Sequence, residues 1–308
     1  MRFATYRNRD ERFDRVGLVE QDRIFGLAPG TSLLGLLAGG REGLSRAGLS
    51  ALDEPAELVM LQDVQLRAPL PNPPSIRDFL GFEEHVRNAR GQVDPDWYEI
   101  PIFYFSNPAA VRGPHDDIEV APGCAEWDYE LELAAVVGAP GSNLTPREAD
   151  EHIAGYMVMC DFSARDLQRR EMQLRLGPAK GKDSATSLGP FLVSAEELDP
   201  FRAERGFQLR MSARVDGRHY GGGTAADLYW SFSEMVAYAS RGTTVLPGDV
   251  IGSGTVGTGC ILELAKMGLG DEYGWLRPGD EVELEIEHVG TLHHRMVAGP
   301  AVVPLRQG

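Results

Sequence analysis

The chain has 308 residues, of which 43% are hydrophobic and 25% are charged, as in proteins that form a packed core. Its 46 acidic and 30 basic residues give a formal net charge of −16, which disfavours nucleic acids and anionic membranes as partners. No apolar run reaches the ~18–20 residues of a membrane span, the N-terminus lacks a signal-peptide pattern, and the three cysteines form no close pair. We therefore expect a cytoplasmic protein of about two domains, with neither disulfides nor a cysteine zinc site.

Residues 1–68 are predicted to form a small β-rich N-terminal domain. The expected elements are strands over Arg2–Arg7 and within Arg15–Leu27, a helix over Thr31–Leu37, a polar stretch, and a strand over Val64–Ala68. The segment Pro69–Pro74 then carries four prolines in six residues, which cannot continue a helix or a central strand. We place a domain boundary there, so that residues 69–308 form the second domain. A rigid loop inside one domain is the alternative.

Strand patterns dominate the chain beyond Pro74. Apolar runs between glycines and prolines predict strands over Asp128–Val137, Phe191–Val193, Phe207–Val215, Asp249–Ser253 and Glu281–Val289. Helical patterns are fewer and cover Ile76–Arg90, Pro146–His152, Ala164–Arg175 and Phe232–Ser240. Because the strands do not alternate regularly with long helices, the predicted fold class is β-rich α+β and not a doubly wound parallel sheet.

Two glycine-rich segments and a histidine pair resemble functional motifs without meeting their requirements. Gly252–Gly257 has the GxGxxG spacing of a dinucleotide site, but Thr258–Leu264 is too short and glycine-interrupted for the helix that such a site needs. We expect a turn there. Gly177–Asp183 has one residue too few between its glycines for a phosphate-binding loop, and it ends in Asp instead of Ser or Thr. His293–His294 is expected to be a surface pair, because no acidic partner stands nearby.

Carboxylates gather in the segment Asp128–Leu133. On a strand, Asp128, Glu130 and Glu132 share one face, and they repel one another unless they are solvated or neutralised. A solvated strand face is one interpretation. The apolar run Leu133–Val137 that follows predicts instead that the strand enters a buried region, where carboxylates need a partner such as a divalent cation.

A further aspartate follows the apolar run Ile153–Cys160. Asp161 ends this run, and Ser163–Asp166 has the pattern of a capping box that opens a helix. Asp161 is therefore expected at a strand-to-helix corner, either as a turn residue or pointing into a crevice. Together with Glu130 and Glu132, it would complete an all-oxygen site that suits Mg²⁺, Mn²⁺ or Ca²⁺ and not Zn²⁺.

Asp78 and His85 are seven residues apart within the predicted helix Ile76–Arg90, a spacing that places both on one face. This pair is a candidate functional constellation. A structural or surface histidine is the alternative.

Six short motifs, in this order, resemble the fumarylacetoacetate hydrolase family over roughly residues 70–290. They are RDF…EEH at Arg77–His85, DYELEL at Asp128–Leu133, CDFSARDLQ at Cys160–Gln168, LGPAKGKD at Leu176–Asp183, GSGTVGTGC at Gly252–Cys260 and LEL at Leu262–Leu264. The resemblance implies a mixed β-sandwich or roll as the catalytic domain, a small β-rich N-terminal domain and a homodimer.

The resemblance also assigns roles to single residues. It implies a metal site made by Glu130, Glu132, Asp161 and Asp78. It implies a catalytic group in which Glu263 orients the histidine, formed by His85, Glu263 and Lys182. It implies substrate contacts by Arg165, Gln168, Tyr104 and Thr255, with Thr186 near them.

The implied reaction is metal-dependent hydrolysis of a carbon–carbon bond in a small 1,3-dicarbonyl carboxylate, such as fumarylacetoacetate or an acylpyruvate, in aromatic-compound catabolism. Mg²⁺ is the expected metal, with Mn²⁺ or Ca²⁺ as alternatives, and His85 would draw a proton from water. Decarboxylation or keto–enol isomerisation, on substrates such as oxaloacetate or 2-hydroxyhepta-2,4-diene-1,7-dioate, is the alternative within the family. A metal-stabilised binding protein and a NAD-dependent oxidoreductase are the alternatives outside it.

Three positions depart from the family pattern and concern the substrate. Leu80 stands where the hydrolases carry a tyrosine, and Asp183 replaces a serine. Asn88 stands where the branches that act on acylpyruvates carry a glutamate. These changes leave the substrate open.

Overall fold

The computed structural model describes residues 1–306 and shows a β-rich α+β protein, which confirms the predicted fold class. The N-terminal strands are β1 (Arg2–Asn8), β2 (Arg15–Glu20), β3 (Arg23–Gly26), β4 (Glu57–Met60) and β5 (Val64–Arg67). They continue into strands of the central sheet, which are β6 (Ile76–Phe79), β7 (Phe103–Ser106), β8 (Val111–Arg112), β11 (Leu131–Val137), β12 (Ile153–Asp161), β14 (Thr186–Ser194) and β17 (Val250–Gly252). The order across this sheet is β4-β3-β2-β1-β14-β12-β11-β17-β6-β7.

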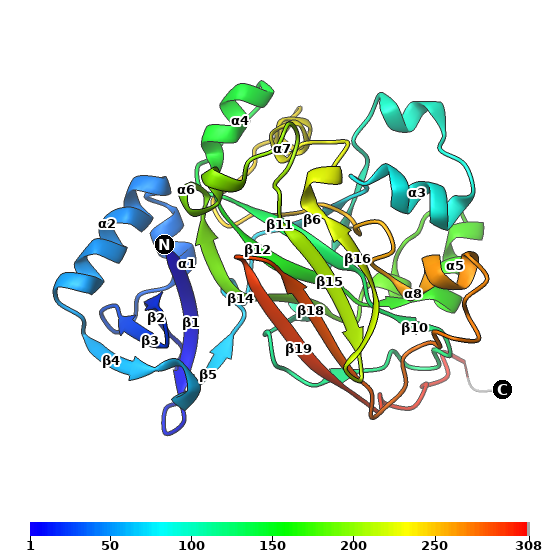
Figure 1. The fold of residues 1–308 in the computed structure, drawn as a ribbon, viewed down its shortest axis with the longest axis horizontal. Helices are drawn as coiled ribbons and strands as arrows, with labels where there is room; N and C mark the ends of the chain where they lie inside the picture. The colour runs from blue at the N-terminus through cyan, green and yellow to red at the C-terminus, as the bar shows by residue number, and fades with distance from the viewer. Residues whose placement is uncertain (307–308) are drawn as a thin grey trace.

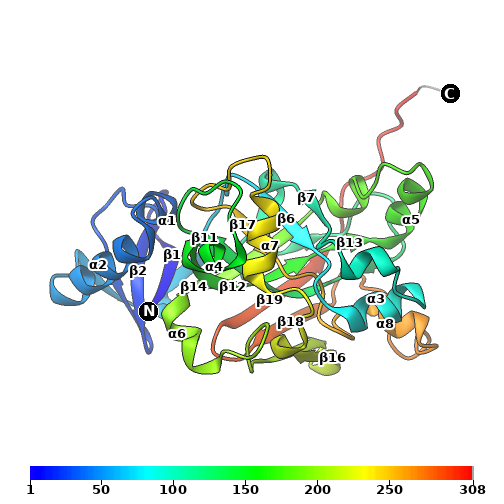
Figure 2. The ribbon, with the colours of Figure 1, turned by 90° about the horizontal axis from the view of Figure 1, so that it is seen from above.

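A second sheet and short helices complete the fold (Figures 1 and 2). The second sheet has five strands. In their order across the sheet, these are β16 (Arg218–Thr224), β15 (Arg210–Val215), β18 (Glu281–Ile286), β19 (Gly290–Val297) and β9 (Ile118–Glu119). A two-stranded ribbon is made by β10 (Trp127–Asp128) and β13 (Ser163–Ala164). The helices are α1 (Leu33–Leu37), α2 (Gly40–Asp53), α3 (Glu83–Arg90), α4 (Pro146–His152), α5 (Arg165–Gln173), α6 (Ala195–Leu198), α7 (Phe232–Ala239) and α8 (Ile261–Lys266). Single 3-10 turns occur at η1 (Leu61–Asp63), η2 (Pro95–Tyr98), η3 (Pro108–Ala110), η4 (Lys180–Lys182), η5 (Asp199–Phe201) and η6 (Ala225–Asp227).

The N-terminal strands extend the central sheet. Strand β1 pairs antiparallel with β14, with Phe3 opposite Leu192, and Figure 1 shows this blue region at one side of the molecule. The 14-residue helix α2 occupies what the sequence predicted to be a polar stretch, and it buries Leu44 and Ala51 in the same core cluster as Phe3. The division into residues 1–68 and 69–308 stays a prediction.

The central strands are buried on both faces, as the apolar run Leu133–Val137 predicted. Every residue of β11 and β12 is buried. Leu131 and Leu133 belong to the larger core cluster, which also contains residues of the second sheet, whereas Ala134 and Val136 pack in the cluster that contains Phe3. Burial of this strand excludes the solvated-face interpretation of its carboxylates.

Among residues 1–306, none of the helices has the length and apolar composition that crossing a membrane requires.

One predicted helix start and one predicted capping box are wrong. Residues 76–79 form strand β6, which is fully buried between β17 and β7, and helix α3 begins only at Glu83. The pairing of β6 on both edges overrides the helical spacing of its apolar residues. Ser163 likewise lies in β13 and donates a hydrogen bond to the carbonyl of Asp161, so the predicted capping box is absent. Asp166 instead accepts hydrogen bonds from the backbone N–H groups of Ala125 and Leu167.

The expected surface pair at the C-terminal strand is correct for one histidine only. His293 is exposed, but His294 is fully buried, its Nδ1 lies 2.8 Å from the carbonyl oxygen of Asp116, and burial lowers its pKa to about 4. The folded state therefore keeps His294 neutral, whereas the unfolded chain protonates it below its usual pKa of 6.5.

We expect the free energy of unfolding to fall as the pH drops from 6.5 towards 4, because protons then bind preferentially to the unfolded chain. His294→Gln should remove about 2–3 kcal/mol of this dependence between pH 7 and pH 4.5, since one pKa unit corresponds to about 1.4 kcal/mol. Urea unfolding at both pH values measures the effect. The exposed His293→Gln variant is the control, and equal pH dependence in the two variants would contradict the expectation.

Candidate active site

A cavity of about 480 Å³ opens at the end of the central strands. Most of the site residues predicted from the sequence line it, although they come from elements that are far apart in the chain. They are Asp78, His85, Tyr104, Glu130, Glu132, Arg165, Gln168, Lys182 and Thr255. Asp161 and Glu263 do not line the cavity, but each contacts a residue that does. Thr186 lies on β14 opposite Asp161 in the sheet register.

The sheet register brings the carboxylates together. Gly252 of β17 pairs with Asp78 of β6 on one side and with Ala134 of β11 on the other, and Asp78 lies opposite Tyr104 of β7. A Cβ atom on Gly252 would lie only 2.8 Å from Asp78 Oδ1 and 2.9 Å from Glu132 Oε2. The first glycine of the GxGxxG pattern therefore provides the room that these two carboxylates need.

Two buried cations hold part of this cluster. Lys182 Nζ forms ion pairs with Glu130 and, at 2.7 Å, with Asp161 Oδ2. Arg165 Nη2 lies 2.7 Å from Glu130 Oε1, and Gln168 Oε1 accepts a hydrogen bond of 3.1 Å from Arg165 Nη1. The hydroxyl group of Tyr104 donates to Asp78 Oδ2 at 2.7 Å and also to Asp161. Glu130 is thus the best paired of the four carboxylates.

Burial sets the protonation of the cluster. It raises the pKa of Asp161 to about 7, and it raises the pKa values of Asp78 and Glu132 above their usual range. Burial acts in the same direction on Glu130, but the charges of Arg165 and Lys182 outweigh it and hold the pKa of Glu130 below its usual range. Three of the four carboxylates therefore lack sufficient positive charge around them.

The unpartnered oxygens of the cluster fit a divalent cation. Asp78 Oδ1, Glu132 Oε1 and Asp161 Oδ1 are buried and have no hydrogen-bond partner within residues 1–306. Ligand oxygens of Asp78, Glu130 and Glu132 lie within 4.8 Å of one another. Within residues 1–306 the four carboxylates form ion pairs only with Lys182 and Arg165, so with all four ionised the negative charge would exceed the positive charge by two. An all-oxygen donor set with this excess suits Mg²⁺ or Mn²⁺.

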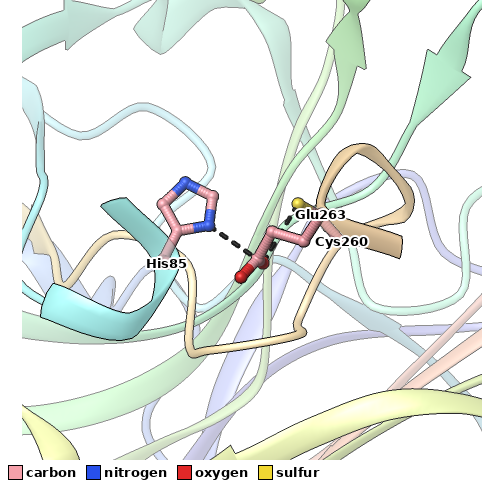
Figure 3. Close-up of side chains that lie close together, drawn as sticks. All are labelled: His85, Cys260 and Glu263. Carbon is pink, nitrogen blue, oxygen red and sulfur yellow. Dashed lines mark hydrogen bonds and ion pairs between the residues drawn. The ribbon is translucent and has the colours of Figure 1, made fainter. Parts of the chain in front are cut away.

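A histidine–glutamate pair borders the cluster (Figure 3). His85 Nδ1 of α3 lies 2.9 Å from Glu263 Oε2 of α8. The other oxygen, Glu263 Oε1, accepts hydrogen bonds from Asn88 Nδ2 at 3.0 Å and from the backbone N–H of Thr258 at 2.9 Å. Burial would raise the pKa of Glu263, but His85 and these donors lower it, so the carboxylate stays ionised. A fixed carboxylate orients the imidazole ring of His85.

Asp128, which the sequence placed on one face with Glu130 and Glu132, has a different position. Its carboxylate accepts hydrogen bonds from the backbone N–H groups of Ile261 and Leu262 at 2.8 and 3.0 Å, at the N-terminus of α8, and from Arg165 Nε at 2.8 Å. Asp128 therefore links the helix that carries Glu263 to the arginine that holds Glu130. The alternation rule failed because β10 ends at Asp128, and β11 begins only at Leu131.

Three basic residues that line the cavity were not predicted from the sequence, and one of them, Arg169, is paired with Glu126. Arg90, the last residue of α3, and Lys266, the last residue of α8, line the cavity and are exposed. Within residues 1–306 neither has an ion-pair partner. Figures 1 and 2 show α3 and α8 side by side, so the two cations lie at the ends of neighbouring helices. Lys266 follows Glu263 by three residues, and this spacing was the sequence signal that could have identified it.

The GxGxxG segment is followed by a helix, contrary to the sequence prediction. Helix α8 has only six residues, but it carries Glu263. The turn before it lies beside the site, because Gly254 and Thr255 line the cavity. No βαβ unit surrounds the segment within residues 1–306, since the next strand, β18, belongs to the second sheet.

We expect no dinucleotide binding at this turn, because its first glycine serves the carboxylate pair and α8 leads into the other sheet. NADH fluorescence measured during titration with the protein should show no saturable change in the micromolar range. A saturable signal that disappears in a Gly254→Ala variant would contradict this expectation.

Comparisons with known proteins show similarity of sequence and of fold. A family model described as fumarylacetoacetate (FAA) hydrolase C-terminal matches residues 75–297. The oxaloacetate tautomerase YisK of Bacillus subtilis (strain 168) is 31% identical over 246 residues, which are 77% of this chain and 74% of that protein. The human mitochondrial oxaloacetate tautomerase FAHD2A is 30% identical over 220 residues, which are 71% of this chain and 64% of the human protein. The structure of a fumarylacetoacetate hydrolase from Exiguobacterium antarcticum is 28% identical, covers 97% of this chain and 100% of its own, and superposes with a TM-score of 0.76.

Proposed function

This chain belongs to the fumarylacetoacetate (FAA) hydrolase family, and from that premise we propose that it is a divalent-metal-dependent enzyme acting on a small 2-oxo carboxylate with a second carbonyl group. The observation that carries the proposal is the His85–Glu263 pair beside a buried cluster of four carboxylates, three of which lack sufficient positive charge around them. A purely structural metal site has no need of an oriented histidine in an open cavity.

We propose Asp78, Glu130, Glu132 and Asp161 as the residues that hold the metal, with Mg²⁺ as the expected ion and Mn²⁺ as the alternative. A divalent cation in such a site supplies Lewis-acid polarisation of a substrate carbonyl, worth several kcal/mol. Tyr104 and Lys182 keep Asp161 in place by their contacts with its carboxylate. Arg165 does the same for Glu130 while Asp128 fixes the guanidinium group.

His85 is proposed as the residue that moves the proton. Its Nδ1 faces Glu263, so the ring proton resides on Nδ1 and the lone pair of Nε2 is left for the cavity that His85 lines. Nε2 can therefore accept a proton from water or from substrate. Lys182 and Arg165 also line the cavity and can stabilise the negative charge that then develops on a substrate oxygen.

For the finer reaction we propose hydrolysis of a carbon–carbon bond. Nε2 of His85 takes a proton from water, the hydroxide adds to the carbonyl carbon, and the carbon–carbon bond breaks with its electron pair moving to the other carbonyl fragment as an enolate, which is then protonated. The similarity to the Exiguobacterium hydrolase supports this reaction. Keto–enol tautomerisation is the second candidate, because YisK and FAHD2A are oxaloacetate tautomerases. Here Nε2 would take a proton from the carbon between the carbonyl groups.

Turnover of a panel of acylpyruvates and oxaloacetate with Mg²⁺ or Mn²⁺, followed by NMR of the products, tests the proposal. Cleavage of an acylpyruvate into two fragments supports hydrolysis, and interconversion of oxaloacetate enol and keto forms supports the second candidate. No metal-dependent turnover of any member would refute the proposed enzyme class. The homodimer, the cytoplasmic location and the role in aromatic-compound catabolism stay predictions.

Arg90 and Lys266 are expected to bind a second carboxylate at the far end of the substrate. The double variant Arg90→Gln, Lys266→Gln should raise KM for a dicarboxylic 2-oxo acid by about 10-fold or more, because a hydrogen bond to a charged group contributes about 1.5–3 kcal/mol. kcat should change little, and a monocarboxylic substrate should be nearly unaffected. Arg147→Gln on α4 is the control, since it removes a charge away from the cavity. Equal changes of KM for both substrates would contradict the assignment.

A further inference from the structure

Three side chains of types that bind metals come together on the Nδ1 side of the active-site histidine. They are His85 itself, Cys260 and Glu263. Cys260, the residue just before α8, lies with its Sγ 3.3 Å from Glu263 Oε2, the same oxygen that His85 Nδ1 approaches to 2.9 Å (Figure 3). The three ligand atoms lie within 4.8 Å of one another, and all three residues are buried. The wide spacing of the cysteines predicted no cysteine zinc site, but a site with one cysteine needs no close pair.

Two of the three separations between these atoms are close to those of a tetrahedral zinc site. With Zn–N and Zn–O near 2.0 Å and Zn–S near 2.3 Å, tetrahedral angles place nitrogen about 3.3 Å and sulfur about 3.5 Å from the oxygen. The observed 2.9 and 3.3 Å would need to widen by only a few tenths of an ångström. His85 Nδ1 is buried and lies against Glu263 Oε2, so a cation bound to both atoms would take the place of the proton between them.

The hydrogen bonds around Glu263 favour the same arrangement. Asn88 and Thr258 both donate to Oε1, which anchors the carboxylate and leaves Oε2 directed towards His85 and Cys260. A sulfur, nitrogen and oxygen donor set selects Zn²⁺ or Co²⁺ over Mg²⁺, whereas the carboxylate cluster has oxygen donors only. The two sites therefore differ in the metal they prefer.

We propose that His85, Cys260 and Glu263 form an inhibitory binding site for Zn²⁺ or a similar borderline-soft divalent cation. The cation binds the lone pair of Nδ1, so the ring proton resides on Nε2, and the thiol of Cys260 releases its proton to solvent as the metal–sulfur bond forms. Nε2 then carries a proton and cannot accept another one. Inhibition, unlike binding, rests on the proposed role of His85 as the base.

Co²⁺ is the probe for binding, because a cobalt–thiolate bond absorbs in the near ultraviolet. Wild-type protein saturated with Mg²⁺ should develop this band with one equivalent of Co²⁺, and Zn²⁺ should abolish it. The band should be absent in Cys260→Ser and in Cys260→Ala. It should persist in Cys124→Ser, a thiol control away from the site, and in Glu132→Gln, which alters only the oxygen cluster. Absence of the band in folded wild-type protein, or its persistence in both Cys260 variants, would overturn the proposal.

Zinc titration supplies the second reading. Loss of Cys260 should lower Zn²⁺ affinity in excess Mg²⁺ by at least about 100-fold, since loss of an outer hydrogen-bond partner alone costs about 10–100-fold. Each variant is compared with its own zinc-free rate, and zinc should inhibit wild type but not Cys260→Ser. Equal inhibition of both would place the zinc effect at the carboxylate cluster and overturn the proposal. A cobalt band together with no turnover of any keto acid would uphold the site while refuting the proposed function.

Discussion

Glu132→Gln is expected to lower the affinity for Mg²⁺ or Mn²⁺ by at least 100-fold and turnover by about 10³-fold, because the metal supplies several kcal/mol and each 1.4 kcal/mol is a factor of ten. Glu132 is the most informative position for this test, because its Oε1 is buried and has no hydrogen-bond partner within residues 1–306. Glu130, in contrast, is already paired with Arg165 and Lys182. Calorimetric metal titration and steady-state rates measure the two effects. Glu283→Gln, an exposed carboxylate on β18, is the matched control.

The same Glu132→Gln variant is expected to be more stable than wild type when no metal is bound. Burial raises the pKa of Glu132 well above its usual range, so at neutral pH this side chain destabilises the metal-free protein, because it must either be buried as a charge or take up a proton on folding. A neutral amide removes this cost, and the Tm of metal-free Glu132→Gln should therefore exceed that of wild type, while added Mg²⁺ should stabilise only wild type. Unchanged metal affinity of Glu132→Gln would refute the assignment of Glu132, and unchanged affinity of the double variant Glu130→Gln, Glu132→Gln would refute the carboxylate metal site as a whole.

The sequence was sufficient for those parts of the site that depend on local pattern. The two glutamates precede and enter a run that becomes continuously apolar, and this run predicted a strand buried on both faces with buried carboxylates at its start. Asp161 at the end of β12 was equally local. The family motifs placed His85 and Glu263 together, although no spacing along the chain predicts that α3 and α8 are neighbours.

The errors arose where pairing between distant segments decides the structure. Asp78 and His85 do share one cavity, but as a strand residue and a helix residue and not as two turns of one helix. Strand β6 forms because it pairs with β17 on one side and β7 on the other, and both of these strands come later in the chain than β6. The helix α2 was missed because its apolar face is narrow and is completed by Phe3 and Leu18 of the N-terminal strands. Asn88 and Asp128 gain their roles only through contacts with α8.

His85→Ala is expected to lower kcat by about 10²–10⁴-fold if His85 is the general base, with metal affinity nearly unchanged because His85 is not among the carboxylate ligands. Loss of kcat with an intact metal site separates a catalytic histidine from one that only supports the fold. The exposed His293→Ala variant on β19 is the control. An effect of less than about 10-fold would remove His85 from the mechanism.

Isotope labelling then decides between the two reactions that His85 could serve. In hydrolysis the oxygen of water must enter a product carboxylate, so turnover in ¹⁸O-labelled water should label that product, and His85→Ala should slow labelling and turnover equally. In tautomerisation no water oxygen is needed, but turnover in D₂O should place deuterium on the carbon between the carbonyl groups, because the proton on His85 Nε2 exchanges with solvent. Deuterium without ¹⁸O, in a product that keeps all the carbon atoms of the substrate, would therefore refute hydrolysis and establish the keto–enol reaction, with the same histidine acting on carbon instead of on water.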